Sequence, residues 1–194
     1  ATCFVCPRVE GAGAAGSRHG VGTAAPQVVL AQRGHDVVIA DSFVNSSPSV
    51  PGRIGRLCGR DFEVHRVDLR DRNATASLFA HDRFDAVLHF AALKAVAESC
   101  ERPLDYFDNN IGGTIHLLQA MAASGVRRLV FSSSATVYGV PDAVPVREDA
   151  GVAATNPYGR SKLVMEQLIG DVCAADPSFR AVNLRYFNPV GEIG

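Results

Sequence analysis

Short apolar segments alternate with segments of helical periodicity from residue 28 onward, and this alternation constrains the fold more than any single motif. The apolar segments are nearly continuous, without regular alternation with polar residues. They cover residues 36–40, 62–67, 84–92, 129–131 and 181–187. Strands of this kind are typical of a parallel sheet that helices cover on both faces. The sequence therefore predicts an α/β fold built on a doubly wound parallel sheet.

Charge and hydropathy exclude several classes of function. The 194 residues carry a formal net charge of −1, which gives no basic surface for nucleic acid or for an anionic membrane. No apolar run is long enough to span a bilayer, and the first residues lack the basic region and apolar core of a secretory signal. We expect a cytoplasmic protein with neither a nucleic-acid nor a membrane partner.

The five cysteines do not indicate a metal site. Cys3 and Cys6 form a Cys-x-x-Cys pair, which could bind metal or cycle between thiol and disulfide, but no second pair completes a zinc site. The other three cysteines are scattered, and the six histidines show no ligand spacing. We expect reduced thiols and no bound metal.

One strand and the helix after it carry the residues of a proton-transfer site. The strand ends in three serines, the last of which is Ser134. Asn156 suits the N-cap of the following helix and Pro157 its first position. Tyr158 and Lys162 then lie four residues apart on one helix face. An ammonium near a phenol favours the phenolate, so we expect Lys162 to lower the pKa of Tyr158 and Ser134 to donate a hydrogen bond. The alternative is a surface lysine beside a half-buried core tyrosine.

Two features point to a dinucleotide. Gly11, Gly13 and Gly16 match the Gly-x-Gly-x-x-Gly pattern that holds phosphates in Rossmann-like folds. Asp41 follows a buried strand, where an acid can hold the adenosine ribose hydroxyls and favour NAD over NADP. A helix-capping aspartate is the alternative for Asp41.

Other polar or small residues also fall where predicted strands end. Ligands of doubly wound sheets bind at the carboxyl ends of the strands. The residues predicted at such ends are Asp41, Asp68, Ala91, Ala92, Ser134 and Phe187. Their coincidence predicts a single ligand site along that edge.

Three helices are predicted around these strands. The segment Val28–Arg33 reads as the last turns of a helix, which Gly34 closes as a C-cap. The segment Asn73–Phe79 reads as a short helix capped by Asn73. A longer helix, which Gly125 closes, has apolar residues at helical spacing that indicate core or a partner interface. They are Leu104, Phe107, Ile111, Ile115 and Leu118.

Several motifs, in order and at compatible spacing, resemble the UDP-glucose 4-epimerase family of the extended short-chain dehydrogenase/reductases. They are Asp41–Asn45, His89–Ser99, Asp108–Asn110, Ser132–Gly139, Tyr158–Lys162 and Arg185–Gly191. The resemblance runs from about Val28 to Gly191. It implies NAD as the cofactor and a UDP-sugar as the substrate.

The resemblance also implies a role for individual residues. The adenosine side would be held by Asp41, Asn45, Ser46, Asp68 and Leu69, and the pyrophosphate and nicotinamide side by Phe90, Ala91, Ala92, Lys94, Asn109 and Phe187. Ser134 and Tyr158 would be catalytic, with Ser134 also contacting the sugar. Lys162 would hold the nicotinamide ribose, and Asn188 would contact the UDP-sugar.

The implied reaction interconverts UDP-glucose and UDP-galactose through a 4-keto sugar, with Tyr158 as the base. Another UDP-sugar, a pentose or an N-acetylhexosamine, stays open as the substrate. Related 4,6-dehydratases carry an Asp-Glu pair after the strand-end serine or threonine, where this chain has Ala135 and Thr136. Dehydration is therefore not expected. The family also forms homodimers, here through helices that contain Leu104–Leu118 and Tyr158–Ile169.

Both ends of the sequence depart from the family pattern. Residues 1–27 are irregular: Gly16 and Asp41 are 25 positions apart, against about 20 in a dinucleotide fold, and Gly20, Gly22 and Pro26 interrupt the helix expected between them. We interpret this as a displaced fingerprint and expect weak NAD binding.

The sequence ends at Gly194, soon after the sixth predicted strand, whereas the family continues into a region that grips the uridine. Residues 1–194 are thus expected to form one NAD-binding, Rossmann-like domain without most of the C-terminal substrate domain. Turnover should be slow or absent. A truncated, non-catalytic protein with a dinucleotide fold is the alternative.

Overall fold

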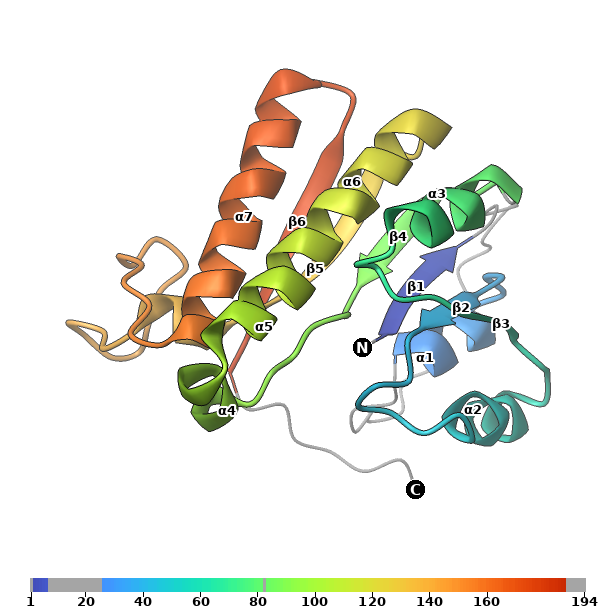
Figure 1. Ribbon diagram of the computed structural model, residues 1–194, viewed down its shortest axis with the longest axis horizontal. Helices are drawn as coiled ribbons and strands as arrows, with labels where there is room; N and C mark the ends of the chain where they lie inside the picture. Colours follow the sequence, from blue (N-terminus) through green and yellow to red (C-terminus); the bar gives the residue numbers. More distant parts are fainter. Residues whose placement is uncertain (1, 7–25, 82, 188–194) are drawn as a thin grey trace.

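A computed structural model describes residues 2–6, 26–81 and 83–187 and shows one six-stranded sheet (Figure 1). The strands are β1 (Thr2–Cys6), β2 (Val38–Asp41), β3 (Glu63–Arg66), β4 (Ala86–His89), β5 (Arg128–Ser134) and β6 (Arg180–Tyr186). Their order across the sheet is β3-β2-β1-β4-β5-β6. The chain builds one half of the sheet and then crosses β1 to build the other, which confirms the prediction of a doubly wound α/β fold.

The direction of β1 differs from the rest of the sheet. β2 and β3 are parallel, and so are β4, β5 and β6. β1, however, pairs antiparallel with both β2 and β4, and its Val5 lies opposite Val38. β1 therefore ends beside the first residue of β2 and begins beside Asp41, the last residue of β2. An antiparallel ladder satisfies the backbone groups as fully as a parallel one, so β1 keeps its hydrogen bonds in this direction.

Helices cover both faces of the sheet. They are α1 (Pro26–Gln32), α2 (Val50–Cys58), α3 (Arg72–His81), α4 (Val96–Glu101), α5 (Pro103–Phe107), the π-helix η1 (Asp108–Gly112), α6 (Gly113–Ser124), the 3₁₀-helix η2 (Ala135–Tyr138) and α7 (Pro157–Ala175). α3, α6 and α7 lie on one face, whereas α1 packs on the other, beside α2 (Figure 1). Among the described residues, none of these helices is both long enough and apolar enough to cross a membrane.

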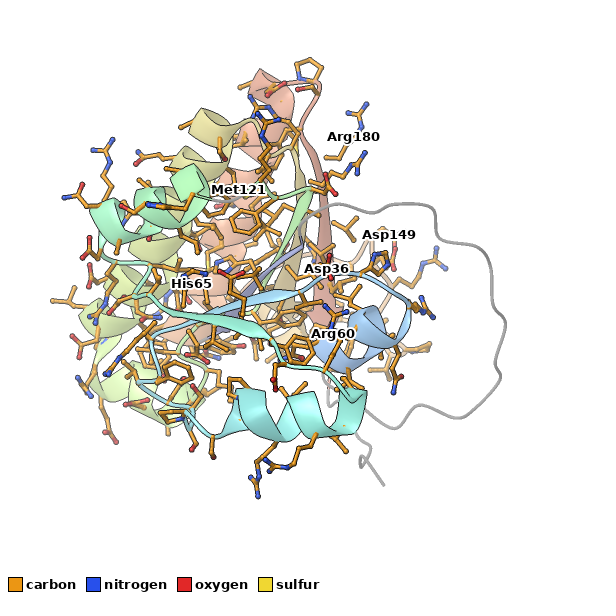
Figure 2. All side chains as sticks on the ribbon, turned by 90° about the vertical axis from the view of Figure 1, so that its right-hand side faces the viewer. Asp36, Arg60, His65, Met121, Asp149 and Arg180 are labelled. Carbon is orange, nitrogen blue, oxygen red and sulfur yellow. The ribbon has the colours of Figure 1, made fainter. Side chains whose placement is uncertain are left out.

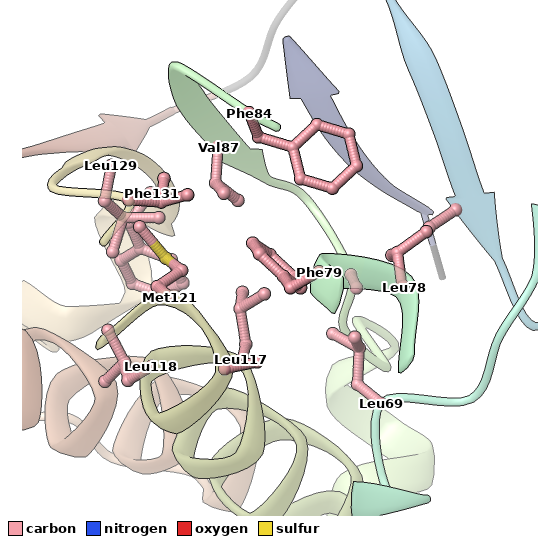
Figure 3. Close-up of a cluster of buried hydrophobic side chains, with 14 of the residues drawn as sticks. Leu69, Leu78, Phe79, Phe84, Val87, Leu117, Leu118, Met121, Leu129 and Phe131 are labelled. Carbon is pink, nitrogen blue, oxygen red and sulfur yellow. The ribbon is translucent and has the colours of Figure 1, made fainter. Parts of the chain in front are cut away.

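The main hydrophobic core lies between the sheet and the layer of α3, α6 and α7 (Figure 3). Val87 of β4, Phe131 of β5 and Leu117 of α6 are fully buried in it. The rings of Phe79 and Phe84 meet edge to face at its α3 end, with centroids 5.2 Å apart. This core fixes α6 and α7 against β4 and β5, and so positions the ends of those strands.

A smaller apolar cluster lies on the opposite face of the sheet. Val37 and Ile39 are buried there against Leu30 of α1. Beside it, Arg60 donates to Asp36 over 2.8 Å and ties the end of α2 to the start of β2 (Figure 2). Because both side chains are partly exposed, this ion pair contributes at most about 1 kcal/mol. An ion pair this weak adds little to the position of β2, which the buried Val37 and Ile39 determine.

Two predicted helix ends are confirmed and one helix start is corrected. Gly34 and Gly125 adopt left-handed backbone angles, with φ of 84° and 77°, just after α1 and α6. Helix α3, however, begins at Arg72, so Asn73 lies inside it. The side chain of Asp71 accepts from the backbone N–H groups of Asn73 and Ala74, at 2.9 and 3.0 Å. The cap of α3 is therefore Asp71, and the prediction of Asn73 was wrong.

The predicted apolar stripe does not run along one face of one helix. Leu118 is buried, whereas Leu104 is 78% exposed and Ile115 is 37% exposed. Leu104 lies before the π-turn of η1 and Leu118 after it, and the π-turn rotates the two relative to each other. Ile115 lies on the same side of η1 as Leu118, so its exposure places it at the border of the buried face of α6. The stripe thus divides into a core part and a surface part.

Replacing Asp71 with alanine should lower the free energy of unfolding by about 1 kcal/mol, because two N–H groups of the first turn of α3 lose their acceptor. Asn73→Ala is the matched control and should change stability by less than about 0.5 kcal/mol. Urea denaturation followed by circular dichroism measures both. Equal losses for the two variants would return the cap to Asn73.

Candidate active site

Asp41, the last residue of β2, organises the loop that follows it. Its side chain is buried, with one carboxylate oxygen accepting from the backbone N–H of Phe43 and the other from Ser46 Oγ, both at 2.8 Å. Ser49 occupies the N-cap position of α2, so Asp41 is not a helix cap. The structure thus brings Asp41 and Ser46 together, as the sequence predicted.

A second group of predicted residues lines a small pocket next to this loop. The pocket is lined by Ser42, Val67, Asp68, Leu69, Ala91 and Asn109. Asp68 pairs with Arg70 at 2.7 Å, and hydrogen bonds from Arg70 lower the pKa of the Asp68 carboxyl. The pocket therefore joins residues from the end of β3, the end of β4 and η1.

The remaining predicted cofactor residues differ from one another in burial and in the elements they contact. Ala92 is buried after β4, and Lys94 is exposed. Phe90 packs against the smaller cluster on the α1 face. Phe187 is 60% exposed, and its ring stacks on that of Tyr138 with centroids 6.3 Å apart. Gly11, Gly13, Gly16 and Asn188 lie outside the described residues.

The start of α7 places Tyr158 and Lys162 beside the end of β5. Asn156 caps the helix through a 2.8 Å bond from the Gly159 N–H to its side chain, and Pro157 takes the first position, which confirms both predictions. A Cβ atom at Gly159 would lie 2.9 Å from the carbonyl oxygen of Thr136. Only glycine there lets α7 begin this close to the residues that follow Ser134.

Lys162 is almost completely buried at this junction. The residue is 3% exposed, and its Nζ donates to the Ser132 carbonyl over 2.7 Å. Nζ also lies 4.8 Å from the centroid of the Phe131 ring. Burial lowers the pKa of Lys162 to about 7, although the charge of Glu166 acts in the opposite direction. The alternative of a surface lysine is therefore excluded.

Tyr158 differs from its predicted state. Burial raises the pKa of its phenol, and a hydrogen bond with Ser134 offsets only part of this rise. Lys162 Nζ lies 6.0 Å from the Tyr158 ring centroid and is committed to Ser132. The expected lowering of the Tyr158 pKa by Lys162 was therefore wrong, because desolvation of the phenol is the larger effect.

Ser134 is placed as predicted, at the end of β5 and within hydrogen-bonding reach of Tyr158. Its Oγ also accepts from the backbone N–H and the hydroxyl of Thr136, at 3.2 and 2.9 Å. With those acceptor positions filled, the Ser134 hydroxyl proton can point toward the phenol or a substrate oxygen.

Asn110 is a buried residue of this site that the sequence analysis did not assign. Its amide donates to the Leu93 carbonyl and to Ser161 Oγ, and its oxygen accepts from the Leu93 N–H and from Asn109. Ser161 in turn donates to the Tyr158 carbonyl. Asn110 thereby joins the loop after β4 to the first turns of α7. Two signals were available: its place in the Asp108–Asn110 motif, and a polar side chain at a core-facing helix position.

Both halves of the site lie along the same edge of the sheet. β2 and β4 are each antiparallel to β1, and β4 is parallel to β5, so β2 and β5 point in one direction. Asp41 and Ser134 are the last residues of those two strands. In the described ranges, no cluster of His, Cys, Asp or Glu has the make-up of a metal site.

Comparison with known proteins agrees with this geometry. Residues 14–193 match the NAD dependent epimerase/dehydratase family. UDP-glucose 4-epimerase 2 of Arabidopsis thaliana is 50% identical over 165 residues, which is 84% of this chain and 47% of the relative. UDP-glucose 4-epimerase of Bacillus subtilis (strain 168) is 47% identical over 164 residues, or 84% and 48%. The chain spans about half the length of the curated relatives it matches.

Solved structures give the same result. UDP-glucose 4-epimerase from Stenotrophomonas maltophila, with bound NAD and formylated UDP-arabinopyranose, is 51% identical with a TM-score of 0.81, covering 86% of this chain and 52% of that one. The enzyme from Bifidobacterium longum, in complex with NAD⁺ and UDP, is 44% identical with a TM-score of 0.81 and coverages of 83% and 48%.

The lowered pKa of Lys162 predicts a pH-dependent stability. Between about pH 7 and pH 10.5 the unfolded chain keeps a proton on Lys162 that the folded chain has released. Unfolding then takes up a proton, so the free energy of unfolding rises with pH in this window, by at most about 1.4 kcal/mol per pH unit.

We expect wild-type protein to gain stability relative to Lys162→Met between pH 7.5 and pH 9.5, with a constant difference below about pH 6. Urea denaturation of both proteins at each pH measures the difference, and the other titrating groups cancel. Parallel stability curves across this window would contradict the buried, neutral lysine.

Proposed function

Because the chain belongs to the NAD dependent epimerase/dehydratase family, we propose that it forms the cofactor-binding part of an enzyme that epimerises a UDP-hexose at C4. The observation that carries the proposal is the placement of Ser134, Tyr158 and Lys162 on the same sheet edge as Asp41. A proton-transfer group and an acid suited to a ribose then border one ligand. The UDP-glucose 4-epimerases among the relatives support the sugar and the cofactor.

The described residues fit NAD on its adenosine and nicotinamide sides. Asp41 provides an anchored carboxylate for ribose hydroxyls, and the pocket of Asp68, Leu69 and Ala91 lies next to it. The small side chains of Ala91 and Ala92 let a ligand approach the end of β4. When bound, NAD would take up the C4 hydride and return it to the other face of the sugar.

Tyr158 would exchange the proton of the sugar 4-hydroxyl, and Ser134 would hold that hydroxyl in line with it. Since the pKa of Tyr158 is raised and that of Lys162 is lowered to about 7, the proton lost near neutral pH is that of Lys162, and its neutral amine would then take the phenol proton of Tyr158. The phenolate–ammonium form of the pair is the one that can accept the sugar proton.

Dehydration is disfavoured by the residues after Ser134. Helix η2 holds no acid in its first turn, and Thr136 spends its hydroxyl proton on Ser134. A carboxylic acid that could protonate a leaving hydroxyl is thus missing from η2.

The identity of the sugar is a finer proposal. We favour UDP-glucose and UDP-galactose, and hence a part in galactose metabolism in the cytoplasm. A second candidate is a larger sugar: the UDP-Glc/GlcNAc 4-epimerase of Campylobacter jejuni is 38% identical with a TM-score of 0.73, covering 77% of this chain and 45% of that one. The exposed Leu104 and Ile115 support a homodimer through α5 and α6.

Cofactor binding can be tested with the 194-residue chain. NADH fluorescence should rise to saturation with weak affinity, and Asp41→Asn should weaken binding about tenfold, because a charge-assisted hydrogen bond to the ribose is lost. Asp36→Asn, at an exposed position before β2, is the matched control and should bind like wild type. Equal affinities for the two variants would exclude Asp41 from the NAD site.

Chemistry is tested by converting UDP-galactose in the presence of NAD⁺. We expect slow conversion that Tyr158→Phe reduces at least about 100-fold, since proton transfer is lost. Tyr186→Phe removes a phenol from β6 and should keep the rate. Conversion that survives Tyr158→Phe would disprove the proposed base, and loss of both NADH binding and conversion would favour the non-catalytic alternative.

A further inference from the structure

Glu166 is a buried carboxylate that the proposed reaction does not use. It lies on α7 and is 7% exposed. Arg185 of β6 grips both of its oxygens, with Nη2 2.7 Å from Oε2 and Nε 3.0 Å from Oε1. Ser133 of β5 donates a third, short hydrogen bond to Oε1. Every oxygen of this carboxylate therefore has a donor from a neighbouring strand.

Glu166 follows Lys162 by one helical turn, on the same face of α7. A lysine and a glutamate at this spacing ordinarily attract each other. In the described part of the chain, however, no ion pair joins them, because Lys162 Nζ donates to the Ser132 carbonyl and Glu166 is held by Arg185 and Ser133. A buried amine and a buried carboxylate thus lie one turn apart and bind different partners.

Arg185 also fixes the residues around the catalytic end of β5. Its Nη1 donates to the Tyr138 hydroxyl at 2.9 Å and to the Glu148 carbonyl at 3.4 Å. The guanidinium carbon lies 4.8 Å from the Tyr138 ring centroid, and that ring stacks on Phe187. The planar guanidinium therefore has its place defined from several sides, which a flexible ammonium would not provide.

We propose that Arg185 is a positioning residue that acts through Glu166. By engaging both carboxylate oxygens, it holds Glu166 away from Lys162 and leaves the Lys162 amine on the Ser132 carbonyl, beside Tyr158 and able to take the phenol proton. Without Arg185, the carboxylate would swing toward Lys162 and form the ion pair that the helix spacing favours. The lysine would then stay protonated, held by the Glu166 carboxylate instead of the Ser132 carbonyl, and could not take the phenol proton.

The charged and titratable groups around Lys162 are few. Tyr158 and Glu166 face it from α7, and His89 from β4. Burial, and then the charge of Lys162, lower the pKa of His89 to about 3, so His89 is neutral in this site. Arg185 acts from β6 behind Glu166. Glu166 is therefore the one carboxylate among these groups whose position can change the protonation of Lys162.

The protonation of Lys162 can be followed by NMR because the chain contains few lysines. It contains two lysines, Lys94 and Lys162, so protein labelled with ¹³C at lysine Cε gives one NMR signal from each. Lys94 is exposed and serves as an internal reference. The pH titration uses the full chain without NAD or sugar. The inference rests on the proposed function, but the titration of Lys162 can be measured even if NADH does not bind.

We expect Arg185→Gln to raise the titration midpoint of Lys162 by about one pH unit or more, as a newly approaching carboxylate does. Arg180→Gln removes the same charge from the other end of β6 and should leave the midpoint unchanged. Glu166→Gln alone should lower the midpoint slightly.

The decisive comparison is Arg185→Gln in a Glu166→Gln background. If Arg185 acts through Glu166, its replacement has little effect there, because no carboxylate remains to move. An equal rise in both backgrounds, or no rise in either, overturns the proposal. Should Arg185→Gln not fold, Arg185→Lys, which keeps the charge and loses the two-pronged grip, is compared in the same two backgrounds and judged by the same outcomes.

Discussion

The contact between the end of β5 and the first half of α7 is the interaction on which the rest of the site depends. Each of the three terminal serines of β5 meets a different residue of the helix. The Ser132 carbonyl accepts from Lys162, Ser133 donates to Glu166, and Ser134 bonds with Tyr158. Because the three helix residues are four apart, one face of α7 carries all of them.

Forming this contact costs free energy of desolvation, which hydrogen bonds from the surrounding residues offset. An ammonium and a carboxylate are both removed from water, which is unfavourable unless each finds good partners. The carboxylate has Arg185, whereas Lys162 has a carbonyl and an aromatic face. Lys162 is thus the less compensated of the two, in keeping with its lowered pKa. Perturbed titrations of this kind are concentrated at functional sites.

Sequence patterns predicted what depends on local chemistry. The helix ends at Gly34 and Gly125, the cap at Asn156 and the strand ends at Asp41 and Ser134 each follow from one residue type in one local context. The patterns could not predict what depends on packing between distant segments. The sign of the Tyr158 pKa change required knowing how deeply the phenol is buried. Asn110 and Arg185 gave little signal, because the partners that tie them to other elements lie 17 to 51 and 19 to 47 positions away.

The central place of β1 has a mechanical consequence. Its two ladders join the half of the sheet that carries Asp41 to the half that carries Ser134, so the two halves are connected through this five-residue strand. A slip of two residues in one ladder keeps the side-chain alternation but displaces one half by about 7 Å along the strand axis. That displacement exceeds the span of a hydrogen bond, so the alignment of the two ends of any ligand that bridges them is set by the pairing of β1.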